Sequence, residues 1–117
     1  LFPSGSEEIN EAGQGEMKKL ADAIIELQRE IPPEINWVLR VDGHTDNRPL
    51  SGTGRYRDNW ELSSARATSV VKFLIANGVP ANRLVAAGFG EYQPLDPADT
   101  DEARNRNRRI ELKLTER

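Results

Sequence analysis

Cysteine is absent from the sequence, and histidine and methionine occur once each in its 117 residues. The lack of cysteine excludes disulfide bonds, thiol catalysis and cysteine-ligated zinc. Long apolar runs are also missing, since none approaches the roughly 20 residues that a membrane-spanning helix needs. We therefore expect contact with a membrane only through a segment outside this sequence. Because the first residue is Leu1 and not methionine, we interpret the chain as a fragment of a longer protein.

The charged residues show no large excess of either sign. They make up 30% of the sequence, and the net charge is only −3. No acidic or basic block is long enough to form a tail, which argues against nucleic acid as a partner. A basic group near the end of the chain is flanked by acidic residues. For two of its members, Arg104 and Arg106, we expect a solvated charged face.

Hydrophobic periodicity predicts two main helices and several strands in one domain, which we place at 1–117. The helices are expected at 16–30 and 59–76, with Asn59 as the N-cap of the second. Strands are expected at 35–41, 84–90 and 109–114, with the end of a further strand at 1–2 and a short helical turn after Asp101. This order predicts an α/β fold, an α+β sandwich in which the two main helices pack on one face of a mixed sheet of about four strands.

One predicted strand ends in a cluster of polar groups. In the strand at 35–41, apolar residues alternate and define a buried face that includes Trp37. The chain continues as Asp42-Gly43-His44-Thr45-Asp46, which places these side chains at the rim of the sheet, where a ligand can meet them. The loop at 47–58 that follows contains two glycines and a proline. Loops of this length inside a compact domain are often functional, although a tolerated insertion would give the same pattern.

One arginine lies on the apolar side of the second predicted helix. At about 100° per residue, Arg66 falls between Leu62 and Val70. A guanidinium keeps its charge when it is buried, so Arg66 must meet an anion or reach solvent through a cleft. The anion could be an internal carboxylate, Asp46 or Asp42, or the carboxylate of a ligand. If Asp46 and Arg66 face one pocket, together they complement a zwitterion that carries an ammonium and a carboxylate on one carbon.

Four motifs, in this order, resemble the OmpA-like peptidoglycan-binding domain. They are Gly43-His44-Thr45-Asp46, Asn59-x-x-Leu62-Ser63-x-x-Arg66-Ala67, Gly88-Phe89-Gly90-Glu91-x-x-Pro94 and Asn107-Arg108-Arg109-Ile110-Glu111. With Phe2-x-Ser4-Gly5-Ser6 at the start, the resemblance covers nearly the whole chain. The long loop before Asn59 and the run Asn59-Trp60-Glu61-Leu62-Ser63 look most like the MotB branch of the family, the cell-wall-anchoring stator proteins of the flagellar motor.

The resemblance implies a binding domain with no catalytic activity, no cofactor and no metal. Its implied partner is peptidoglycan, recognised through the diaminopimelate residue of the stem peptide. In the family, the Asp of the His-Thr-Asp motif receives the ammonium and the Arg of the Leu-Ser-x-x-Arg-Ala motif receives the carboxylate, here Asp46 and Arg66. The other family cleft positions correspond to Thr45, Asn59, Leu62 and Arg108.

The resemblance also implies a location and an assembly. We expect a periplasmic domain of a Gram-negative cell-envelope protein that is anchored in the inner or the outer membrane. The MotB-like features further predict that the full protein is a homodimer.

Two other functions fit parts of the sequence. Asp42, His44 and Asp46 alternate along the chain and could form the site of a metal-dependent hydrolase. Against this, His44 is the only histidine, and no second pair of metal ligands follows it. Alternatively, Trp37 and Trp60 could anchor a protein-interaction module of an envelope complex. Trp37 falls on the predicted buried face, so a core position fits it better.

Overall fold

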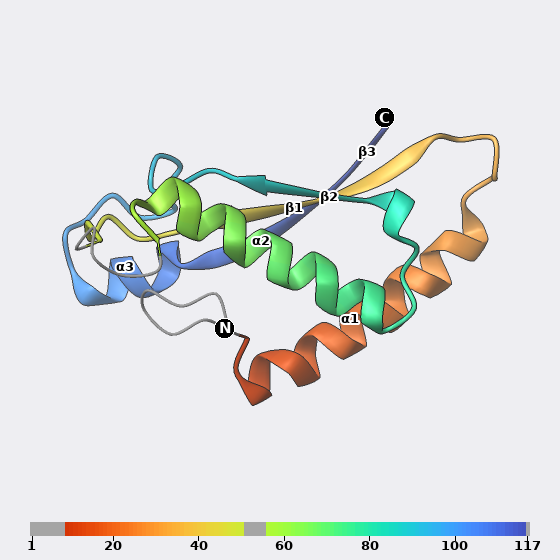
Figure 1. Cartoon of the computed structure of the whole chain (residues 1–117), viewed down its shortest axis with the longest axis horizontal. Coiled ribbons are helices and arrows are strands. Elements are labelled where there is room, and N and C mark those ends of the chain that lie inside the picture. Colours follow the sequence, from red (N-terminus) through yellow and green to blue (C-terminus); the bar gives the residue numbers. More distant parts are fainter. Residues whose placement is uncertain (1–8, 51–55, 117) are drawn as a thin grey trace.

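The computed structural model describes residues 9–50 and 56–116 (Figure 1). The elements, in chain order, are α1 (Glu11–Glu30), β1 (Trp37–His44), α2 (Asn59–Ala76), the 3-10 helix η1 (Ala81–Arg83), β2 (Leu84–Gly88), α3 (Asp101–Asn107) and β3 (Arg109–Glu116). No helix within these two ranges is both long and apolar enough to cross a bilayer. The further strand expected at 1–2 lies outside the described residues.

The three described strands form a mixed sheet in the order β2-β1-β3. β1 is the central strand. It runs parallel to β2, with Leu39 opposite Leu84, and antiparallel to β3, with Leu39 opposite Leu114 on that side. A parallel pair needs a crossover connection, and α2 provides the one between β1 and β2. The mixed α/β class is confirmed.

The numbers of strands and helices differ from the prediction of about four strands and two main helices. The described residues contain three strands and three α-helices. The additional helix is α3, which occupies seven residues where only a helical turn was expected. Thr100 stabilises its start, because the hydroxyl oxygen accepts a hydrogen bond from the backbone N–H of Ala103 at 3.1 Å.

The start of α1 and the N-cap of α2 also differ from the prediction, whereas the bounds of α2 are confirmed. α1 begins at Glu11 and not at 16, because the side chain of Asn10 accepts a hydrogen bond from the Gly13 N–H at 2.7 Å and caps the helix there. The N-cap of α2 is Asp58 and not Asn59. Its carboxylate accepts from the Glu61 N–H at 2.9 Å, which leaves the Asn59 side chain available for other contacts.

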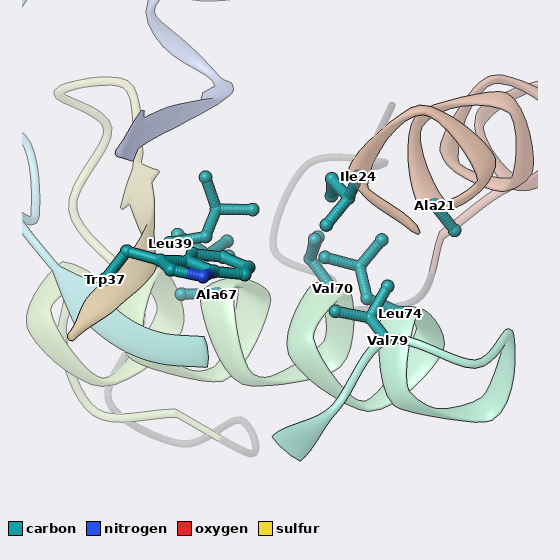
Figure 2. Packing of buried hydrophobic residues seen from close by; sticks show 9 residues of the cluster. Ala21, Ile24, Trp37, Leu39, Ala67, Val70, Leu74 and Val79 are labelled. Atoms are coloured by element: carbon teal, nitrogen blue, oxygen red, sulfur yellow. The ribbon is translucent and has the colours of Figure 1, made fainter. Parts of the chain in front are cut away.

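The main core lies between the sheet and the two long helices. α1 and α2 lie on the same side of the sheet, as predicted, and α3 lies at one end of it (Figure 1). Figure 2 shows the cluster that these elements bury, which consists of Ala21, Ile24, Trp37, Leu39, Val41, Ala67, Val70, Leu74 and Val79. Trp37 is 3% exposed, so its assignment to the core is confirmed. Ile35, predicted to share that face, precedes the strand and is 38% exposed.

Two paired glycines let α2 approach the sheet closely beside the polar end of β1. Gly43 of β1 lies opposite Gly88 of β2. A Cβ atom on Gly43 would lie 2.1 Å from the backbone oxygen of Ser63, and one on Gly88 would lie 2.1 Å from the Ser64 hydroxyl oxygen. Any larger side chain at either position would push α2 away from the sheet. These glycines therefore set the separation between the helix and the strand that carry the predicted site.

Candidate functional site

A cavity of about 130 Å³ lies where β1 ends and α2 begins. It is lined by Thr45, Asp46, Arg48, Pro49, Leu50, Asn59, Leu62 and Arg66. Five of the six residues predicted from the sequence therefore line one cavity. The sixth, Arg108, does not line it but contacts Asp46.

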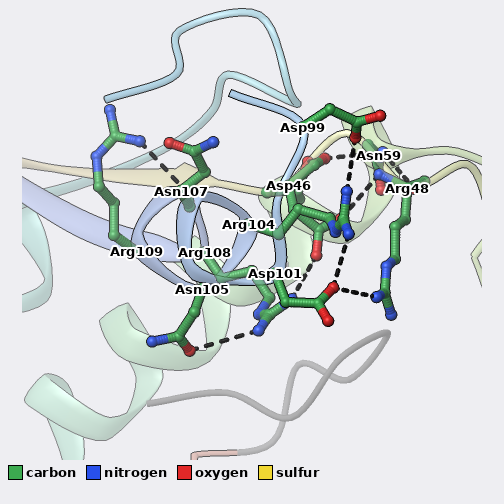
Figure 3. A network of polar contacts seen from close by, with 11 residues as sticks. Asp46, Arg48, Asn59, Asp99, Asp101, Arg104, Asn105, Asn107, Arg108 and Arg109 are labelled. Carbon is green, nitrogen blue, oxygen red and sulfur yellow. Dashed lines mark hydrogen bonds and ion pairs between the residues drawn. The ribbon is translucent and has the colours of Figure 1, made fainter. Parts of the chain in front are cut away.

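Asp46 is buried, with 6% of its surface exposed. Nη1 of Arg108 donates a hydrogen bond to Asp46 Oδ2 at 2.6 Å, and the backbone N–H of Arg48 donates to Oδ1 at 3.0 Å (Figure 3). An ionised carboxylate has about four acceptor positions. After these two bonds, Asp46 can still accept hydrogen bonds from a donor in the cavity. Arg108 thus holds the carboxylate from one side in a charge-assisted contact.

Arg66 projects from the buried side of α2 and is 1% exposed. Its neighbours along that side, Leu62 and Val70, are 2% and 0% exposed, so the predicted position of a charge within an apolar stripe is confirmed. Of the two carboxylates considered as its partner, Asp46 lines the same cavity. Asp42 instead forms a two-point ion pair with Arg40, at 2.7 and 2.9 Å. The cavity therefore brings together one carboxylate and one buried guanidinium.

Thr45 and Asn59 fix the backbone around Asp46. The N–H of Thr45 donates to the carbonyl oxygen of Gly90 at 3.0 Å, and the Thr45 hydroxyl donates to the Asp46 carbonyl oxygen at 3.0 Å. Nδ2 of Asn59 donates to the carbonyl oxygens of Asp46 and Arg48, at 3.3 and 3.1 Å. Asn59 was predicted to cap α2, and this prediction is wrong. Its side chain connects the start of α2 to the loop that forms one wall of the cavity.

Arg48, which is not among the residues predicted from the sequence, extends the site toward α3. Its side chain donates to Asp101 at 2.9 Å, and Asp101 also accepts from Arg104 at 2.6 Å (Figure 3). The hydrogen bond from Arg104 lowers the pKa of Asp101, and the charge of Arg48 lowers it further. The (i, i+3) spacing of Asp101 and Arg104 was a usable signal for this pair, but nothing in the sequence connected it to Arg48.

The predicted solvated face at Arg104 and Arg106 is wrong for Arg104. Only 17% of the Arg104 side chain is exposed, and its guanidinium forms ion pairs with Asp99 and Asp101. Arg106 is 54% exposed and pairs with Asp96. The acidic flanks that suggested a solvated surface are instead the partners of these arginines.

The three polar residues of the Asn-Arg-Arg motif make three different contacts. Asn107 is buried, and its Oδ1 accepts from the N–H groups of Leu95 and Asp96 at 2.9 and 3.1 Å. Arg108 contacts Asp46 as described above. Arg109 pairs with Glu111, and this hydrogen bond lowers the pKa of the Glu111 carboxyl. Only the middle residue of the motif therefore reaches the cavity region.

The residues proposed for a metal-dependent hydrolase do not converge. Asp42 is paired with Arg40, and Asp46 with Arg108. The His44 ring stacks on Phe89, with ring centres 5.1 Å apart. Burial lowers the pKa of His44, and the nearby Arg109 lowers it further. Within 9–50 and 56–116, no three acidic, histidine or cysteine side chains are placed to hold a metal ion.

Comparison with known proteins gives one consistent family. The OmpA family model matches residues 1–108. The chain is 34% identical over 97 residues to Motility protein B of Helicobacter pylori, a match that covers 83% of this chain and 37% of that protein. It is also 34% identical over 99 residues to Outer membrane protein A of Bordetella avium, covering 85% and 47%. The chain spans less than half the length of the curated relatives it matches.

Solved structures of MotB share the fold. The C-terminal domain of Helicobacter pylori MotB superimposes with a TM-score of 0.85 at 30% sequence identity, covering 98% of this chain and 82% of that one. A longer crystal structure, described as the periplasmic domain of the same protein, gives a TM-score of 0.83 at 30% identity and covers 99% and 69%. That structure's domain is described as periplasmic, which agrees with the location expected for this chain from its sequence. The family model, the sequence relatives and the shared fold agree: this chain belongs to the OmpA family and is MotB-like within it.

Proposed function

We propose that this domain binds peptidoglycan non-covalently, through the diaminopimelate residue of the stem peptide, and so anchors an envelope protein to the cell wall. The observation that carries the proposal is the shared cavity of Asp46 and Arg66. Diaminopimelate ends in an ammonium and a carboxylate on one carbon. The Asp46 carboxylate would receive the ammonium, and the Arg66 guanidinium would receive the carboxylate.

The surroundings of the two charges favour this orientation of the ligand. Two of the four acceptor positions of Asp46 are occupied by Arg108 and by the backbone N–H of Arg48, so the remaining ones can accept from an ammonium. Arg66 is almost fully buried and keeps its charge, so its guanidinium can attract the carboxylate of a ligand in the cavity. Leu62 supplies an apolar contact for the carbon that joins the two ligand groups. Thr45 and Asn59 hold the wall against which the ligand would lie.

The volume of the cavity fits a small head group, and it predicts a weak intrinsic affinity for diaminopimelate. A volume of about 130 Å³ holds several water molecules, and an amino-acid head group displaces a comparable amount. Binding must displace this water and must also restrict the ligand, so two charged contacts leave little net free energy. We therefore expect free diaminopimelate to bind weakly. Two linked copies of the domain, as in the predicted homodimer, would hold one sacculus more firmly than a single copy.

Co-sedimentation with purified diaminopimelate-type peptidoglycan tests the proposal. We expect Asp46→Asn and Arg66→Met to abolish sedimentation, because each removes one charge at similar side-chain volume. Asp42→Asn is the matched control, since Asp42 is also a buried carboxylate of the same segment paired with an arginine, but it lies outside the cavity. Sedimentation of folded Asp46→Asn and Arg66→Met at the wild-type level would refute the proposal.

The proposed role needs no chemical step. The quoted relatives are named as a motility protein and an outer membrane protein, and neither name denotes an enzyme. We propose a purely binding function, with the MotB likeness favouring attachment of a flagellar-motor-type protein to the wall. Homodimerisation of the full protein stays a prediction from that likeness.

A further inference from the structure

We propose that the stacked pair Trp60 and Tyr92 is a second subsite, a platform that binds a sugar ring of the glycan strand. This inference rests on the proposed function, because it places the sugar beside the stem peptide that the cavity would hold. The two rings stack with centres 5.1 Å apart and an angle of 27° between their planes. We call this pair the aromatic platform.

The aromatic platform is exposed although it consists of two large rings. Trp60 is 51% exposed and Tyr92 is 61% exposed. Most aromatic rings gain stability from burial, so two rings that stack on each other and still face water leave much apolar area available for contact. The stack also restricts both side chains before any ligand arrives, which reduces the entropy lost on binding.

The backbone under the aromatic platform is fixed by a glycine with an unusual conformation. Gly90 has a φ of +64°, and a Cβ atom there would lie 3.4 Å from both aromatic rings. A side chain at this position would be strained because of the positive φ. The N–H of Gly90 donates to the Ser63 hydroxyl at 2.9 Å, which ties this turn to α2. The turn therefore holds Tyr92 against Trp60.

The aromatic platform is connected to the proposed stem-peptide cavity through the first turn of α2 and the turn at Gly90. Trp60 lies between Asn59 and Leu62 in the first turn of α2, and both of these residues line the cavity. The carbonyl oxygen of Gly90 accepts the hydrogen bond from the Thr45 N–H, so the turn beneath the rings also supports the cavity wall. In peptidoglycan, the stem peptide is joined to a sugar only two residues before diaminopimelate. The two residues span about 3.5 Å each or more, and the diaminopimelate side chain that ends in the head group adds further length. The extended stem therefore lets the sugar lie up to about 20 Å from the bound head group.

The chemistry of the surface around the aromatic platform suits a saccharide. A pyranose ring presents C–H groups on its faces and hydroxyl or amide groups around its edge. The C–H face meets the electron-rich face of an aromatic ring favourably. Beside Trp60 lies a broad, open recess that is also lined by Tyr56, Glu61 and Ser64. Glu61 and Ser64 are exposed and provide hydrogen-bonding groups for the edge of the ring.

Two ligands separate this inference from the proposed function. One is the sugar-free stem tripeptide that contains diaminopimelate, and the other is the same tripeptide joined to its disaccharide. Affinities are measured by calorimetry for the wild type, Trp60→Ala, Tyr92→Ala and Asp46→Asn. The control is Leu95→Ala, which removes a 64% exposed apolar side chain outside the aromatic platform. Circular dichroism confirms that each variant is folded.

We expect the wild type to bind the disaccharide ligand about tenfold or more tightly than the sugar-free peptide, the effect of one stacked ring. Trp60→Ala and Tyr92→Ala should lose that advantage and keep the affinity for the sugar-free peptide, while Leu95→Ala should match the wild type. Equal affinity of the wild type for both ligands, or an undiminished advantage in Trp60→Ala, would overturn the inference and assign the rings to another partner, such as a protein. Unchanged binding of the sugar-free peptide by Asp46→Asn would instead contradict the proposed function.

Discussion

Replacement of Gly43 by alanine should separate the two halves of the site by a predictable amount. The new Cβ atom would lie 2.1 Å from the backbone oxygen of Ser63, whereas ordinary contact begins near 3.4 Å. The difference means that α2 must move away from β1 by about 1.3 Å. The contact is with backbone, so no side chain can rotate to relieve it. The shift moves Arg66 on α2 away from Asp46, which follows β1.

The expected cost of Gly43→Ala has two parts. Overpacking of this kind destabilises a folded protein by about 1–3 kcal/mol. Charge-assisted contacts weaken steeply with distance, so affinity for peptidoglycan should fall by about tenfold or more even in the folded fraction. The variant should therefore bind worse than its stability alone explains.

Urea unfolding and co-sedimentation measure the two effects separately. Gly15→Ala is the matched control, because nothing lies within 4 Å of a Cβ atom at this exposed position in α1. Alanine there should raise the free energy of unfolding by up to about 1 kcal/mol and leave binding unchanged. If Gly43→Ala unfolds and sediments like the wild type, the close packing of α2 on β1 does not set the geometry of the site.

Two further predictions concern charges. In a double-mutant cycle followed by urea unfolding, Asp46→Asn and Arg108→Gln should show a coupling free energy of about 1.5–3 kcal/mol, because this ion pair is largely buried. Additive effects of the two substitutions would show that Arg108 does not hold Asp46. For His44, the pKa is lowered in the folded state, so between that value and about 6.5 the unfolded chain binds more protons. The contribution of His44 to the free energy of unfolding should therefore be fully present above about pH 6.5 and be lost as the pH decreases through the lowered pKa. His44→Gln should flatten this pH dependence in thermal melts. An unchanged profile would assign the pH dependence to another group.

The parts of the site that follow from periodicity could be predicted from the sequence. The helical repeat placed Arg66 among apolar neighbours, and a guanidinium that stays charged needs an anion wherever the helix packs. The alternating strand placed Asp46 just beyond its end. These arguments require only local geometry, and the structure agrees with both. The sequence does not decide whether Asp46 or Asp42 is the carboxylate near Arg66, because that depends on which arginine each carboxylate contacts in the folded chain.

The features that could not be predicted depend on contacts between distant segments. Asp58 and Asn59 are both residue types that cap helices well. Asp58 caps α2, whereas the amide of Asn59 donates hydrogen bonds to two carbonyl oxygens in the preceding loop. Arg48 lies in a loop without periodicity, so nothing local indicated its contact with Asp101, 53 positions later. Val38 does not belong to the alternating buried set of its strand, yet it is only 4% exposed, because alternation cannot show when both faces of a strand are covered.

The most direct test of the central claim compares two stem peptides that differ only in one carboxylate. One contains diaminopimelate and the other contains lysine, which keeps the ammonium but lacks the carboxylate beside it. In NMR titrations, the diaminopimelate peptide should shift the amides of Thr45, Asp46, Asn59 and Arg66, and the lysine peptide should bind about tenfold to a hundredfold more weakly, because the contact with Arg66 is lost. Equal affinities, or shifts confined to residues away from the cavity, would contradict the account.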